Sequence, residues 1–127
     1  MASAKRSTIL IAEDNDGLRA LLASLLRDEG FHVLEAGDGI RTVRLLAQHD
    51  IDALLIDVRL GSEDGVALGR DLRLDRPDLP IALMSGDSSG SEAMSRAGGL
   101  TDVFLGKPFT LAALVATVEE LLDRRTD

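Results

Sequence analysis

A chain of 127 residues with a formal net charge of −8 has the length of a single domain, and it contains no cysteine. The acidic balance, without clusters of Lys and Arg, argues against direct contact with nucleic acid, and the lack of cysteine excludes disulfides and thiolate metal sites. No apolar run is long enough for a signal peptide or a membrane span, so we expect one cytoplasmic domain over residues 1–127, with 1–6 and 124–127 frayed.

The first half of the chain alternates between two apolar patterns. A short continuous apolar run predicts a strand at Thr8–Ala12. Leucines at helical spacing from Asp16 onward predict a helix, and Gly30 follows its last apolar turn, where it suits a C-terminal cap. A second strand is expected at His32–Ala36 and a second helix at Gly39–Gln48.

The second half continues the alternation. A strand is expected at Ala53–Ile56, and after a Gly-containing loop a helix of about ten residues should end before Pro77, because the residue before a proline disfavours helical geometry. A fourth strand is expected at Ile81–Met84. The segment Ser85–Gly99 is rich in Ser and Gly and makes a poor helix. A short fifth strand is expected at Val103–Leu105.

The clearest helical pattern in the chain follows Thr110, which offers an N-cap. Its apolar face consists of Leu111, Leu114, Val115, Val118, Leu121 and Leu122. Strands and helices that alternate without an internal repeat predict an α/β domain, and we expect a doubly wound parallel sheet of five strands with right-handed crossovers.

Five polar side chains stand just beyond the predicted strands. Glu13 and Asp14 follow the first strand, Asp57 the third, Ser85 the fourth and Lys107 the fifth. Ligands of open α/β sheets bind beyond the carboxyl ends of the strands, so we expect these groups to converge in space.

Converging carboxylates require a cation, because two unit charges about 4 Å apart interact by roughly 4 kcal/mol at an effective dielectric near 20. The acidic donors are all oxygens, without His or Cys, and this favours Mg²⁺ over zinc or copper. Asp57 can serve as a nucleophile, Lys107 supplies a compact positive charge, and Ser85 can donate to a phosphoryl oxygen. The set predicts phosphoryl transfer to Asp57 with Mg²⁺.

Four motifs carry a resemblance to a known family: Ile11–Asn15, Leu55–Asp57, Leu83–Gly86 and Lys107–Phe109. With these motifs the chain resembles, over nearly its whole length, the receiver domains of two-component response regulators. The resemblance implies the flavodoxin-like (βα)5 receiver fold. It also implies a phosphoacceptor, Asp57, that takes its phosphoryl group from a histidine kinase or histidine phosphotransfer protein and switches contacts with a downstream protein target.

The resemblance also implies a ligand set for Mg²⁺. Asp14 and Asp57 would bind the ion directly, Glu13 would act mainly through a water, and the backbone carbonyl of Arg59 would complete the set. Such a domain is not expected to be a dedicated enzyme, although it would catalyse its own phosphorylation and its own dephosphorylation.

Further family features concern the switch. Ser85 takes the place of the family's hydroxyl switch residue and Phe104 that of its switch aromatic. The Lys107–Pro108 peptide bond is expected to be cis. A homodimer through the last strand and helix is compatible with the resemblance, whereas direct contacts with nucleic acid or a membrane are not expected.

The loop after Asp57 departs from the family, since Val58–Gly61 lacks the usual Met-Pro and Arg59 places a cation near the pocket mouth. A degenerate receiver that only binds proteins therefore remains an alternative. An aspartate-nucleophile phosphatase would need a second Asp where Arg59 stands. A flavin domain would need a donor-rich loop after the first strand, where this chain is acidic.

Simpler roles are also open for single residues. Asp14 or Asp16 could merely cap the first helix, and Ser85 could be an ordinary turn residue. Lys107 could be a solvated surface lysine, and Phe104 could be part of the core.

Overall fold

The computed structural model describes residues 7–86 and 103–126. The core of the molecule is a five-stranded parallel sheet in the order β2-β1-β3-β6-β7. Its strands are β1 (Thr8–Ala12), β2 (His32–Ala36), β3 (Ala53–Asp57), β6 (Ile81–Ser85) and β7 (Val103–Gly106). This is the doubly wound sheet that the sequence pattern predicts, with the flavodoxin-like strand order that the resemblance implies.

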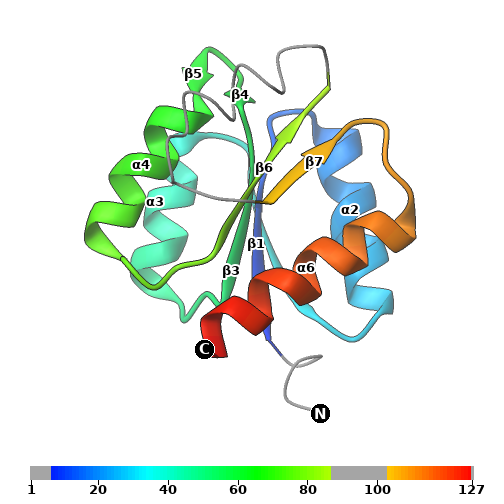
Figure 1. The fold of residues 1–127 in the computed structure, drawn as a ribbon. Helices are drawn as coiled ribbons and strands as arrows, with labels where there is room; N and C mark the ends of the chain where they lie inside the picture. Colours follow the sequence, from blue (N-terminus) through cyan, green and yellow to red (C-terminus); the bar gives the residue numbers. More distant parts are fainter. Residues whose placement is uncertain (1–6, 87–102, 127) are drawn as a thin grey trace.

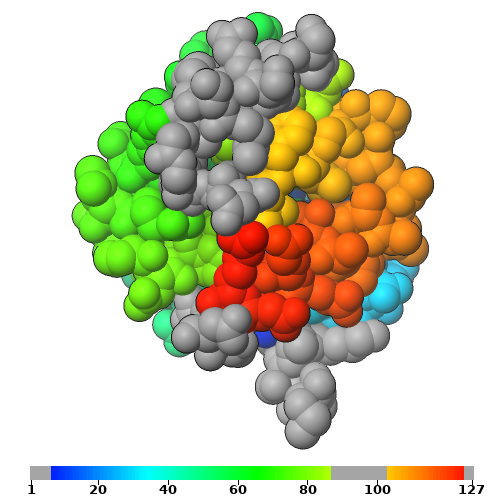
Figure 2. All heavy atoms as spheres, in the orientation of Figure 1, coloured from blue at the N-terminus to red at the C-terminus, as the bar shows by residue number. Residues whose placement is uncertain are grey.

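Helices cover both faces of the sheet (Figure 1). The pair α3 (Gly39–Gln48) and α4 (Gly65–Asp75) lies on one face, and the pair α2 (Asp16–Asp28) and α6 (Leu111–Thr126) lies on the other. In the space-filling view, α6 and the segment leading into it form the orange and red part of the surface, with α4 in green beside them (Figure 2).

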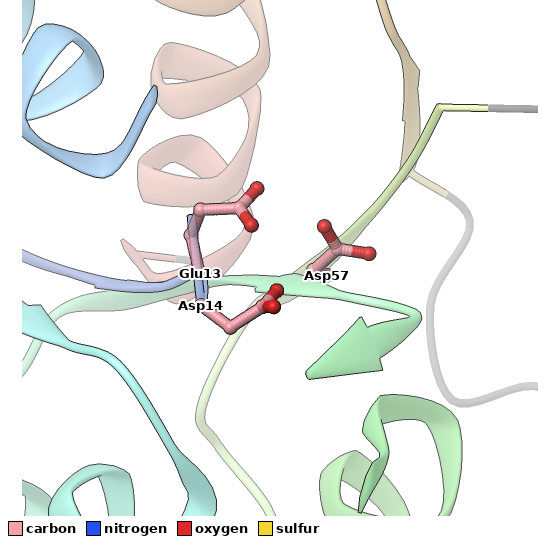
Figure 3. A group of neighbouring side chains, drawn as sticks. All are labelled: Glu13, Asp14 and Asp57. Atoms are coloured by element: carbon pink, nitrogen blue, oxygen red, sulfur yellow. The ribbon is translucent and has the colours of Figure 1, made fainter. Parts of the chain in front are cut away.

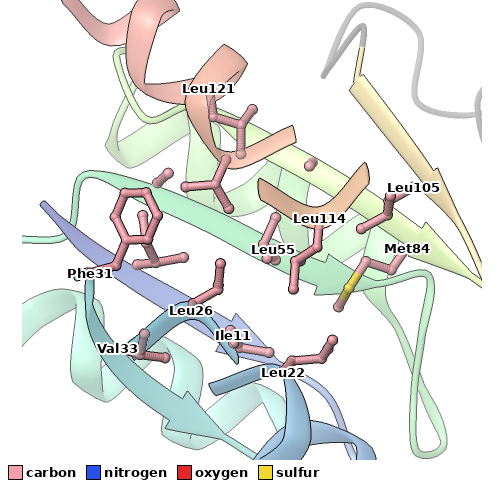
Figure 4. Packing of buried hydrophobic residues seen from close by; sticks show 14 of the residues in the cluster. Ile11, Leu22, Leu26, Phe31, Val33, Leu55, Met84, Leu105, Leu114 and Leu121 are labelled. Atoms are coloured by element: carbon pink, nitrogen blue, oxygen red, sulfur yellow. The ribbon is translucent and has the colours of Figure 1, made fainter. Parts of the chain in front are cut away.

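The strands divide their side chains between two apolar clusters. On β1, Leu10 and Ala12 belong to the cluster under α3 and α4, whereas Ile9 and Ile11 belong to the cluster under α2 and α6 (Figure 4). Because a strand turns successive side chains to opposite faces and both faces are covered, its sequence is a continuous apolar run.

The helix ends follow the local sequence. Asn15 caps α2, since its Oδ1 accepts from the Leu18 amide at 2.9 Å, so neither Asp14 nor Asp16 takes that role. Gly30, just past the end of α2, has φ of 101°, the left-handed conformation that glycine adopts without strain. Thr110 Oγ1 accepts from the Ala113 amide at 3.0 Å and caps α6, as predicted.

Three of the strands run one residue further than predicted, so Asp57, Ser85 and Gly106 are their last residues. The loop after β3 contains a small antiparallel hairpin that the sequence does not predict, made of β4 (Arg59–Leu60) and β5 (Glu63–Asp64).

The remaining expectations concern the ends and one internal segment. Residues 1–6, where fraying is expected, and most of the predicted poor helix at Ser85–Gly99 lie outside the described residues. Helix α6 continues through Thr126. Within the described residues, no helix is long and apolar enough to cross a membrane.

Candidate functional site

The end of β1 supplies two of the predicted acids. The Glu13 backbone N–H donates to the Ala36 carbonyl at 3.0 Å, which continues the β1–β2 ladder past the strand. The Arg19 guanidinium of α2, which the sequence reasoning missed, donates to the Glu13 carbonyl at 2.8 Å. Fixed in this way, Glu13 is buried at 1% exposure, whereas Asp14, one residue later, is exposed.

The end of β3 holds Asp57 in a tightly bonded segment. The Val58 amide donates to the Met84 carbonyl of β6 at 2.8 Å, and the Gly65 amide donates to the Val58 carbonyl at 2.9 Å. The Arg59 amide donates to Asp57 Oδ1 at 2.9 Å. The carboxyl group of Asp57, with the residue 6% exposed, is therefore oriented by backbone groups on its own loop.

The carboxyl groups of Glu13, Asp14 and Asp57 face a common space (Figure 3). One ligand oxygen from each lies within 4.8 Å of the others, and this is the one such group of three His, Cys, Asp or Glu residues within the described residues. Two of the three acids are buried, which concentrates negative charge where water screens it poorly.

Lys107 reaches this group from the end of β7. Its Nζ lies 2.5 Å from Glu13 Oε1 and 2.5 Å from Asp57 Oδ2. The backbone holds it in place, because the Lys107 amide donates to the Ser85 carbonyl at 2.7 Å and the Lys107–Pro108 peptide bond is cis, as expected from the family resemblance. Lys107 is thus a partner of the acidic cluster and not a solvated lysine.

Burial and charge change the pKa of both partners. Burial raises the pKa of Glu13, and the hydrogen bonds from Lys107 and the Asn15 amide only partly offset it. Burial lowers the pKa of Lys107, but hydrogen bonds and charge from Asp57 and Glu13 outweigh that effect, so the pKa is raised overall. Lys107 therefore stays charged, and the pocket keeps a fixed positive group opposite the acids.

The other predicted residues lie near the same edge of the sheet. Ser85 is buried at the end of β6, one residue after Met84, which pairs with Asp57. Phe104 on β7 is half-buried against the cluster under α3 and α4. Arg59 brings its amide to Asp57, while its side chain is exposed.

The donor set fits a hard divalent cation. Glu13 and Asp57 share the single charge of Lys107, and within the part of the chain that the structure describes no hydrogen bond reaches the Asp14 carboxylate. Three carboxylates and one lysine leave an excess of negative charge, and all the available side-chain donors are oxygens, as Mg²⁺ prefers.

A groove of about 510 Å³ opens beside Lys107. One wall is α2, with half-buried Leu18 and exposed Leu21, and the other runs from Lys107 to Leu111 at the start of α6. Its lining is predominantly apolar, in contrast to the acidic pocket next to it.

Comparisons with known proteins agree on one family. A family model described as the response regulator receiver domain matches residues 9–119. The chain is 35% identical over 117 residues to the transcriptional regulatory protein PrrA of Mycobacterium bovis, covering 92% of this chain and 50% of that protein. It is 34% identical over 116 residues to the response regulator MprA of Mycobacterium leprae, covering 91% of this chain and 51% of that protein. The chain thus spans about half the length of these curated relatives.

Solved structures give the same result. A response regulator receiver protein from Sinorhizobium medicae superposes with a TM-score of 0.82 at 34% identity, covering 94% of this chain and 97% of that one. A response regulator receiver domain protein from Clostridium thermocellum superposes with a TM-score of 0.87 at 20% identity, covering 94% and 97%, which shows the shared fold.

Proposed function

Because the chain belongs to the response regulator receiver domain family, we propose that it accepts a phosphoryl group on Asp57 from a histidine kinase or a histidine phosphotransfer protein. One observation carries the proposal. The buried Asp57 carboxylate lies within a group of three acids and 2.5 Å from Lys107, at the carboxyl end of a central strand. An acid with only a structural role would not need two further carboxylates and a lysine beside it.

The chain's own groups have distinct tasks in this reaction. A carboxylate oxygen of Asp57 forms the new bond to phosphorus, and the donor's P–N bond to histidine breaks with its electron pair leaving on the histidine nitrogen. The Arg59 amide orients Asp57, and Lys107 keeps a positive charge beside the incoming phosphoryl oxygens. Ser85 would donate its hydroxyl hydrogen to one of them.

Mg²⁺ held by Asp14, Asp57, the Arg59 carbonyl and, through a water, Glu13 would neutralise charge on the phosphoryl oxygens. This ligand assignment is supported by the shared space between the three acids. It is also supported by their excess negative charge over Lys107.

We assign the output to a change in protein contacts. Ser85 and Phe104 would respond to the phosphoryl group and alter the surface that meets a downstream protein target. The apolar groove beside Lys107 suits a protein donor, because it adjoins the acceptor site. A homodimer through β7 and α6 and a cytoplasmic location complete the proposal.

Incubation with acetyl phosphate and Mg²⁺, followed by intact mass measurement, tests this function. The wild type should gain one phosphoryl group, and none when EDTA replaces Mg²⁺. Asp57→Asn should gain none, whereas Asp71→Asn, at an exposed position on α4, should behave as the wild type. A wild type that stays unmodified would indicate a degenerate receiver, and a modified Asp57→Asn would refute the choice of acceptor.

A further inference from the structure

The hairpin of residues 59–64 holds backbone groups next to Asp57, yet little within the hairpin holds it in place. Each of its strands is two residues long, and a two-stranded ribbon is marginally stable by itself. Gly61, at its turn, has φ of 65°, and a Cβ built there would lie 4.0 Å from Asp14 Cβ. The hairpin therefore runs alongside the acidic cluster at both its start and its turn.

Two consecutive acids at the end of the hairpin bind two different helices. Asp64 Oδ1 accepts from the Val66 and Ala67 amides at 2.9 and 3.2 Å, which caps α4. Glu63 Oε1 accepts from the Gly39 amide of α3 at 2.8 Å, across 24 residues of sequence. The first amides of a helix lack partners within the helix and carry its positive end, so both positions favour a carboxylate.

The contact between Glu63 and Gly39 requires a glycine. A Cβ built on Gly39 would lie 2.4 Å from Glu63 Oε2 and 3.0 Å from Oε1, so any side chain there would push the carboxylate away. Helix α3 does not need Glu63 as its cap, because Asp38 Oδ1 already accepts from the Arg41 amide at 2.7 Å. The contact therefore joins the hairpin to a helix start that has its own side-chain cap.

We propose that Glu63 is a positioning residue for the phosphoacceptor site. By accepting from the Gly39 amide, it ties the hairpin to α3 and sets the Arg59 backbone beside Asp57. The consequence for Mg²⁺ and phosphorylation rests on the function proposed above, in which the Arg59 amide orients Asp57 and its carbonyl faces the ion.

Four variants distinguish a positioning role of the contact between Glu63 and Gly39 from a simple effect of the Glu63 charge. Glu63→Ala removes the carboxylate, whereas Glu63→Gln keeps an acceptor oxygen at the same reach without the charge. Gly39→Ala displaces the carboxylate without changing any charge, and alanine is the better helix former. The double variant, Glu63→Ala with Gly39→Ala, tests whether the two changes act on the same contact. Glu119→Ala, at an exposed position on α6, is the control for charge.

The first readout is amide hydrogen exchange at Arg59 in metal-free protein, and the second is the Mg²⁺ dissociation constant. Glu63→Ala and Gly39→Ala should each raise the exchange rate of the Arg59 amide and the Mg²⁺ dissociation constant roughly fivefold or more, because each variant loses one hydrogen bond to a charged group. In Glu63→Gln both quantities should stay within about twofold of the wild-type values. In the double variant neither should change more than in the single variant with the larger effect. The rate of phosphorylation by acetyl phosphate should fall in Glu63→Ala and Gly39→Ala and stay close to the wild-type rate in Glu63→Gln.

Two results would overturn the proposal. If Arg59 exchange and Mg²⁺ affinity stay at the wild-type level in Glu63→Ala and Gly39→Ala, the contact does not position the site. If Glu63→Gln is as harmful as Glu63→Ala while Gly39→Ala is harmless, the effect is electrostatic. A wild type that takes no phosphoryl group would refute the proposed function alone, because exchange and Mg²⁺ affinity still decide the role of Glu63.

Discussion

At the scale of single residues, the site combines groups that oppose one another. Glu13 and Asp57 are buried and share Lys107, whereas Asp14 adds a third negative charge that Lys107 does not contact. The pocket is therefore suited to an ion and poorly balanced without one. An excess of buried negative charge of this kind costs stability, as is common at binding sites.

Asp14→Ala should stabilise the metal-free protein, because it removes repulsion from Glu13 and Asp57. Since Asp14 is exposed and its charge is screened by solvent, the gain in free energy of unfolding should not exceed about 1 kcal/mol. In excess Mg²⁺ the wild type should be the more stable of the two proteins, because an ion that binds the folded wild type more tightly than the folded variant stabilises the wild type more. Urea unfolding in EDTA and in Mg²⁺ measures both effects, with Asp71→Ala as the control. A variant that is less stable than wild type in EDTA would contradict the electrostatic account.

At the scale of elements, α4 begins in direct contact with β3, the strand that ends at Asp57. A Cβ built on Gly65 would lie 1.8 Å from the Asp57 carbonyl oxygen and 3.2 Å from the Val58 carbonyl carbon. These neighbours are backbone atoms of a segment held by the bonds from the Val58 amide to the Met84 carbonyl and from the Gly65 amide to the Val58 carbonyl, so they have little freedom to move. The start of α4 and the end of β3 form one unit.

Gly65→Ala should therefore destabilise the protein by about 3 kcal/mol, the upper range for overpacking a rigid site. It should also lower Mg²⁺ affinity, because relief of the clash would move β3 at Asp57. Gly17→Ala on α2 is the matched control, since its Cβ would have only Asn15 Oδ1 nearby, at 3.6 Å, and alanine favours a helix. Thermal unfolding of both variants gives the comparison. Equal melting temperatures would show that the loop relaxes freely.

The sequence predicts the regular elements well because their signals are local. Continuous apolar runs mark the buried strands, and Asp57 and Lys107 follow from their positions after such runs. The hairpin at 59–64 is not predictable in this way, because its strands are too short to show a two-residue apolar period and the bond from Gly39 to Glu63 joins residues 24 apart in the sequence. The alternative that Asp14 or Asp16 merely caps α2 does not hold, since Asn15 between them is the cap and satisfies the same preference.

At the scale of the whole molecule, the sheet separates two apolar clusters while the site lies at the edge common to both. Asp57 ends a strand whose Leu54 and Ile56 pack under α3 and α4 and whose Ala53 and Leu55 pack under α2 and α6. A change at this edge can therefore reach either face. The proposed switch concerns Ser85, Phe104 and α6, which lie toward the β7 side of the sheet.

Beryllofluoride with Mg²⁺, a mimic of the phosphoryl group, should shift backbone NMR signals at Phe104 and along α6 as well as around Asp57. The reason is that Ser85 gains a new acceptor at the pocket, and a ligand shifts an equilibrium by its differential affinity for two states. Ser85→Ala should confine the changes to residues that touch the pocket. If the wild-type changes are already so confined, the domain is a phosphate relay without a conformational switch.

The strict alternation of side chains along each strand also decides where this chain tolerates insertions. One extra residue within β3 would exchange the faces of Leu54 and Leu55, and it would displace Asp57 from its partners. An extra residue at exposed Asp50, on the opposite edge where β3 has not yet begun, would leave that alternation intact. The two edges of the sheet thus differ as sites for grafting: peptide tags or binding loops belong at the edge where strands start, away from the acidic pocket.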